Sequence, residues 1–81
     1  MKPLQVWSWA GWYHNNIQTN EVVAAHSAAE VSRIAGVSSP ARLHNLGVTG
    51  NEKEIIQAMR HPGVIFWHRV HQNPPVWRAR P

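Results

Sequence analysis

The stretch 51–70, NEKEIIQAMRHPGVIFWHRV, predicts a capped helix, a sharp break and the most apolar strand of the chain. Asn51 and Glu54 form a capping box, in which the Asn side chain accepts from a free amide and the Glu reaches back. Residues 61–63 (HPG) end the helix, because Pro lacks an N–H and Gly accepts a positive φ. Residues 64–67 (VIFW) are β-formers. We expect this strand to lie under the helix that precedes it.

A β-hairpin is expected at the N-terminal end. Residues 4–13 (LQVWSWAGWY) are rich in β-formers, and alternation places Trp7 and Trp9 on one face of that strand. Gly11 predicts a bulge. Residues 21–26 (EVVAAH) form the second strand, which pairs back after a polar turn.

The middle of the chain predicts a second helix followed by a short helical turn. Ser27 and Glu30 form another capping box, and the apolar spacing predicts a helix over 28–35 that ends at Gly36. Ser39-Pro40 is typical of a helix start, so a short turn of helix is expected over 41–46.

The expected fold is α+β in a single domain spanning residues 1–81, in the order β-β-α-α-β-β. Residues 76–78 (VWR) add a short edge strand after a proline turn. The predicted sheet is antiparallel with three to four strands, and the two main helices are expected to pack on one face of it.

Composition limits the classes of protein that this chain fits. It has 81 residues and no cysteine, so neither a disulfide framework nor a Cys-based metal site is expected. No apolar run approaches the length of a membrane span, and we expect a soluble, cytoplasmic protein with no membrane contact. No metal or other cofactor is predicted.

The net charge of +4 belongs to the C-terminal segment. Residues 1–59 carry equal numbers of basic and acidic side chains, whereas residues 60–81 carry four arginines and no acid. Arginine favours bidentate contact with phosphate or carboxylate. A solvated basic end that keeps the protein soluble is an equally good interpretation.

Tryptophan and arginine together suggest a binding surface. If the helices cover one sheet face, the other would expose Trp beside Arg, for base stacking or for a protein interface. The chain has five tryptophans, and the competing interpretation is that most of them fill a small core. The candidate surface comprises Trp7, Trp9, Trp67, Arg69, Trp77, Arg78 and Arg80.

Residues 30–46, EVSRIAGVSSPARLHNL, resemble the helix-turn-helix of bacterial repressors and excisionase-like regulators. The resemblance weakens in the second helix, where Leu43 and Leu46 fall one residue late and Pro40 lies inside the helix. A one-residue shift turns an anchoring side chain by about 100° on a 3.6-residue period. A plain helix, turn and cap is the preferred interpretation.

Six histidines raise the possibility of a metal site or of a small metal-independent RNase. His68 and His71 are three apart on a strand, so they are expected on opposite faces, and the other four lack ligand spacing. Tyr13, His14, His68 and Arg69 would be neighbours if the first strand paired with the strand at 64–70. This arrangement is the third hypothesis, and we expect no enzyme.

The order of segments resembles a class of small proteins encoded by tailed bacteriophages. The pattern consists of a strand leading into a capped helix, VVAAHSAAEVSRIAG, and then TGNEKEIIQAMRHPGVIFW. These motifs are structural, so no functional residue is implied. The resemblance implies phage origin and action in the cytoplasm of a host cell.

The leading hypothesis is therefore a non-catalytic protein that binds and modulates a host protein or complex. The alternative is a DNA- or RNA-binding protein that uses its basic C-terminal segment and exposed Trp. A homodimer is left open.

Overall fold

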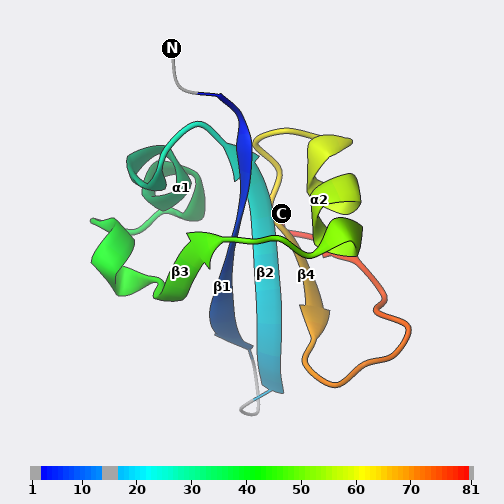
Figure 1. Cartoon of the computed structure of the whole chain (residues 1–81). Coiled ribbons are helices and arrows are strands. Elements are labelled where there is room, and N and C mark those ends of the chain that lie inside the picture. The colour runs from blue at the N-terminus through cyan, green and yellow to red at the C-terminus, as the bar shows by residue number, and fades with distance from the viewer. Residues whose placement is uncertain (1–2, 14–16, 81) are drawn as a thin grey trace.

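The computed structural model describes residues 3–13 and 17–80, and of residues 12 and 13 it describes the backbone. The fold is α+β, as predicted (Figure 1). The elements in chain order are β1 (Gln5–Tyr13), β2 (Ile17–Ala25), α1 (Ala28–Ala35), the 3₁₀ turn η2 (Pro40–Arg42), β3 (His44–Val48), α2 (Glu52–Met59), β4 (Phe66–Arg69) and β5 (Arg78–Ala79).

The strands form one antiparallel sheet in the order β3-β1-β2-β4-β5. The predicted hairpin is present, and β2 begins at Ile17, within the segment expected to be a turn. Pairing between β1 and β2 runs without interruption from Gln5↔Ala25 to Tyr13↔Ile17. A bulge at Gly11 was thus a wrong expectation for this pair, and the irregular register lies between β1 and β3, at Ser8 and Ala10.

The expectation that both helices pack on one face of the sheet was wrong. One buried cluster joins Val6, Val22, Ala24 and Phe66 to Ala58 of α2. The other joins Trp9, Val23, Ala25 and Ile65 to Val31 of α1. Successive strand residues point to opposite faces, so α1 covers one side of the sheet, the α1 face, and α2 covers the other, the α2 face (Figure 1).

Both helices begin where the sequence predicts. In α1, the Ser27 side chain accepts from the Glu30 amide, and Gly36 adopts a positive φ of 76°. In α2, Asn51 Oδ1 accepts from the Glu54 amide at 3.2 Å. The carboxylate of Glu54 does not reach back as expected, because its Oε1 accepts from Asn20 Nδ2 on β2 at 3.3 Å.

The short turn of helix expected over 41–46 is present only in part. Only Pro40–Arg42 forms a helical turn here, and His44–Val48 forms the edge strand β3 beside β1. Asn45 adopts a positive φ of 58°, which short polar side chains tolerate and a helix excludes. The second helix of a helix-turn-helix is therefore absent from this segment.

The C-terminal strands set the position of the candidate site. β4 pairs with β2 and not with β1, and β5 pairs with β4 through Phe66↔Ala79 and Trp67↔Arg78. With β3 included, the sheet has five strands where three to four were expected. The long β4–β5 connection passes beside the N-terminal end of α2 (Figure 1).

Candidate functional site

Three of the predicted surface residues lie together at the β4–β5 end of the α1 face. The indole of Trp67 and the side chains of Arg69 and Arg78 line a hollow of about 440 Å³, which Gln72 and Val76 complete. We call these five residues the arginine patch. Arg78 Cζ lies 6.0 Å from the centroid of the Trp67 ring, which is within cation–π range.

The arginine patch presents positive charge without a carboxylate in its lining. Arg69 and Arg78 are both exposed, whereas Trp67 is half-buried. Because Arg78 already lies over the Trp67 ring, that ring is a support for the guanidinium more than an open stacking surface. A guanidinium held in this way is suited to a carboxylate or phosphate of a partner.

Arg80 extends the basic surface, but its guanidinium is engaged. Arg80 Nε lies 3.1 Å from Oε1 of Glu21 on β2. The Glu21 side chain is 3% exposed and that of Arg80 is 33% exposed, so the carboxylate is shielded from solvent and the guanidinium is partly accessible to it. Arg80 also lines a second hollow on this face with Arg42 and His44.

Two predicted surface tryptophans belong to the core of the α1 face. Trp9 is 3% exposed and is part of the buried cluster under α1. Trp7 packs against the same cluster, and its Nε1 donates to the carbonyl of Ala25 at 3.1 Å. In this fold Trp9 is not available for surface contact, because α1 covers the strand face that the sequence led us to expect as open.

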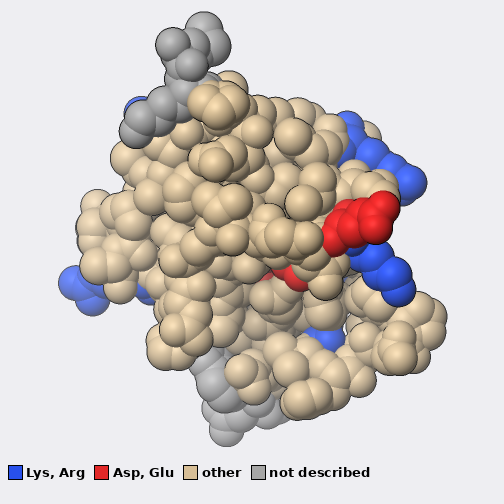
Figure 2. Space-filling model, viewed as in Figure 1, with Lys and Arg blue, Asp and Glu red and all other residues tan. Residues whose placement is uncertain are grey.

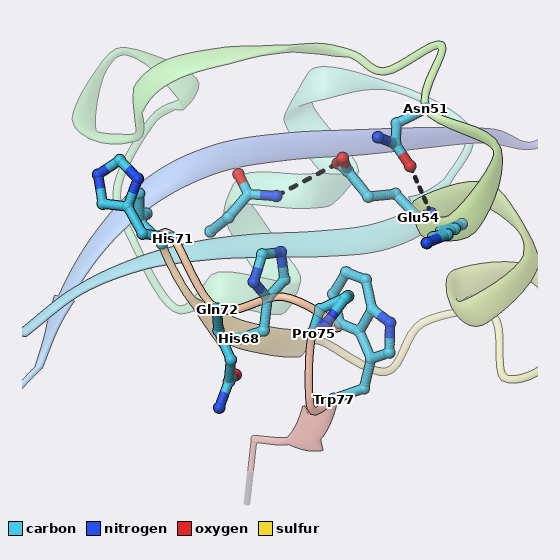
Figure 3. A pocket seen from close by; sticks show the side chains of 10 residues that line it. Asn51, Glu54, His68, His71, Gln72, Pro75 and Trp77 are labelled. Carbon is cyan, nitrogen blue, oxygen red and sulfur yellow. Dashed lines mark hydrogen bonds between the residues drawn. The ribbon is translucent and has the colours of Figure 1, made fainter.

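Trp77 lies on the other side of the sheet. It packs against the α2 face cluster, and its ring meets the ring of His68 edge to face, with centroids 4.6 Å apart. Both residues line a hollow of about 430 Å³ between α2 and the β4–β5 connection, which we call the loop pocket (Figure 3). Gln72 lines both the loop pocket and the arginine patch.

The residues of the RNase hypothesis are not brought together by the strand pairing it required. β4 pairs with β2, so His68 lies opposite Asn20, and Arg69 lies opposite Thr19. His68 and Arg69 point to opposite faces, since they are neighbours on one strand. His14 and the Tyr13 side chain lie outside the described residues.

Sequence reasoning missed two parts of this arrangement. No role was predicted for Glu21, although a lone carboxylate at the start of the apolar run Val22–Ala25 signals a buried charge in need of a partner. His71 was expected on the other face of the strand from His68. Both residues line the loop pocket, because β4 ends at Arg69 and His71 takes a positive φ of 70°.

Two of the four acidic residues, Glu52 and Glu54, belong to α2, and the other two, Glu21 and Glu30, belong to β2 and α1. In the view of Figure 2 the acidic residues in sight lie on the side of the molecule where α2 is seen, next to basic side chains. In the described ranges, 3–13 and 17–80, no three His, Cys, Asp or Glu are placed to hold a metal ion. Neither described helix is long and apolar enough to cross a membrane.

The chain was compared with protein-family models, with curated proteins and with solved structures, and none of them matches it.

Proposed function

We propose that this chain is a non-catalytic binding protein that docks on an acidic surface of a partner protein through the arginine patch. The observation that carries the proposal is the Trp67–Arg78 contact beside the exposed Arg69, in a hollow without a lining acid. Trp and Arg are enriched among residues that dominate interface energies. On the bacteriophage resemblance, the partner would be a protein of the host.

A protein partner is favoured over nucleic acid by where the tryptophans lie. Binding of single strands uses several open aromatic rings for successive bases. Here Trp9 is buried, Trp77 lies on the opposite face and Trp67 carries Arg78 on its ring. What is left on the α1 face is a set of guanidinium groups, for which carboxylates are suitable partners.

Retention of a partner from nuclease-treated host lysate tests this proposal. We expect the immobilised protein to retain a specific protein, and Arg69→Ala with Arg78→Ala to lose it. The matched control is Arg33→Ala with Arg60→Ala, which removes the same charge from exposed positions at the ends of the two helices and keeps the partner.

The salt dependence of the complex provides the second readout. Complexes held by many phosphate contacts weaken by orders of magnitude from about 50 to 200 mM salt, and a protein interface centred on Trp and Arg changes far less. Binding that vanishes with nuclease, or that is equally lost in both double variants, would contradict the proposal. The first of these outcomes would favour the nucleic-acid alternative.

A further inference from the structure

The loop pocket is a further hollow, which shares only Gln72 with the arginine patch. It lies on the α2 face, between the first turn of α2 and the β4–β5 connection, with a volume of about 430 Å³. This size is within the range of small-molecule sites. Figure 3 shows Asn51 and Glu54 on one side of the space, and His68, Gln72, Pro75 and Trp77 on the other.

Several side chains of this pocket have hydrogen-bonding groups that can still bind a ligand. His68 Nδ1 lies 2.8 Å from the carbonyl oxygen of Arg69, and because a carbonyl can only accept, Nδ1 carries the hydrogen. In the neutral ring, Nε2 of His68 therefore keeps a lone pair. Among the described residues, the side chains of Lys53 and His71 have no hydrogen-bond partner.

The polar side chains that do have partners are fixed in position by them. Glu54 Oε1 accepts from Asn20 Nδ2, Asn51 Oδ1 accepts from the Glu54 amide, and Gln72 Oε1 accepts from the Val76 amide. Each of these amide side chains keeps N–H groups that can donate to a ligand. The lining carries one positive charge, on Lys53, and one negative charge, on Glu54, whose Oε1 is engaged by Asn20.

One wall of the pocket is apolar and flat. Pro75 and Trp77 lie side by side there (Figure 3), and the Trp77 ring is held by its edge-to-face contact with His68. A side chain that is half-buried and packed against the core cannot easily turn away, so this wall is present before any ligand arrives. Such a wall suits a flat aromatic or heteroaromatic ring.

We propose that the loop pocket binds a small anion with a flat aromatic body. Its ring would lie against Pro75 and Trp77, and its anionic group would pair with Lys53. Polar atoms at the ring edge would meet His68 Nε2 and the Asn20–Glu54 pair. This proposal does not depend on the arginine patch, which lies on the other face of the sheet.

Two sources of this chemistry can be told apart by titration followed by NMR of the full chain. The probes are AMP and UMP as nucleotides, indole-3-carboxylate as an aromatic acid, and ribose 5-phosphate as an anion without a ring. We expect AMP or indole-3-carboxylate to shift the signals of the Trp77 indole and the His68 ring with a submillimolar Kd. Shifts with the nucleotides alone would identify a nucleotide as the source. Shifts with both classes would show that the pocket recognises the ring and the anion that they share.

Variants on α2 provide the matched control. Lys53→Gln is expected to weaken binding about tenfold by removing the charge pair, whereas Arg60→Gln, also exposed and beyond the pocket, leaves Kd unchanged. Arg69→Ala with Arg78→Ala should leave Kd unchanged too, which separates this site from the proposed docking surface. Absence of shifts with every probe, ribose 5-phosphate binding as tightly as AMP, or equal effects of Lys53→Gln and Arg60→Gln would overturn the proposal.

Discussion

Arg80 Nε lies 3.1 Å from Glu21 Oε1, so the last described residue is tied by its side chain to the central strand of the sheet. The Arg80 amide also donates to the carbonyl of Ile65 at 2.8 Å, which keeps the chain beside β4. The side chain reaches past β4 to β2. The end of the C-terminal segment is therefore part of the packed fold, whereas Arg60, Arg69 and Arg78 of the same segment are exposed.

Removing Arg80 should destabilise the protein more than neutralising Glu21. Arg80→Met takes the guanidinium away from a carboxylate that is 3% exposed, and we expect a loss of about 1–3 kcal/mol in the free energy of unfolding. Glu21→Gln should cost less, since the partly exposed Arg80 can turn to water. Urea unfolding measures both, with Arg69→Met as the exposed control at about 0.5 kcal/mol or less. Equal losses in the two variants would contradict this asymmetry.

Gly11 leaves room for the Glu21 carboxylate. A Cβ added at Gly11 would overlap the carboxylate oxygen of Glu21 and would lie 2.7 Å from Thr19 Oγ1. Gly11→Ala is therefore expected to cost about 1–3 kcal/mol, the usual range for overpacking. Measured by thermal unfolding, Gly11→Ala should cost clearly less stability when Glu21 is also replaced by Ala. If the losses of the two substitutions were additive, the Glu21 carboxylate would not be the group that the new Cβ meets.

Thr19→Val is expected to leave stability unchanged or raise it. Thr19 is fully buried, and within the described part of the chain its Oγ1 has no hydrogen-bond partner. An unsatisfied buried hydroxyl costs about 1–3 kcal/mol, which the methyl group of Val removes at nearly the same volume. Ser32→Ala is the contrasting variant and should lower stability, because the Ser32 hydroxyl donates to Ala29 O at 2.7 Å. Destabilisation by Thr19→Val would point to a partner for the hydroxyl.

Arg78→Lys should weaken partner binding although it keeps the charge. Lysine has neither the planar group that lies over Trp67 nor the fork that pairs with a carboxylate. We expect Arg78→Lys to raise the partner's Kd about tenfold, and Arg33→Lys, on α1, to leave it unchanged. Calorimetry with the partner identified by retention measures both, and a Kd unaffected by Arg78→Lys would reduce the role of this residue to simple charge.

Local signals in the sequence identified the helices, whereas signals that depend on pairing did not. Ser27, Gly36 and Asn51 define the ends of α1 and the start of α2 through contacts within a few residues, so the predicted boundaries match the structure. β3 could not be found this way. Its strand conformation depends on pairing with β1, 34 to 41 residues away, and on the positive φ of Asn45.

The prediction of which sheet faces the helices cover was wrong for a different reason. Val22–Ala25 is a continuous apolar run with all four residues buried, and such a run predicts cover on both faces of a strand. The prediction of one open face rested on the alternation in β1 and not on this run. Consequently, the face with Trp7 and Trp9 was expected to be open. Four of the seven candidate residues, Trp7, Trp9, Trp77 and Arg80, lie outside the arginine patch.

Gln72 belongs to two hollows that open on opposite sides of the sheet. The β4–β5 connection thus separates the two hollows. Two ring contacts at its ends, Trp67–Arg78 on the α1 face and His68–Trp77 on the α2 face, hold it in place. A ligand or partner that moves this connection on one face of the sheet therefore also changes the shape of the hollow on the other face. By thermodynamic reciprocity, a small molecule that tunes partner binding through this connection would itself be held more or less tightly by the partner, to the same factor.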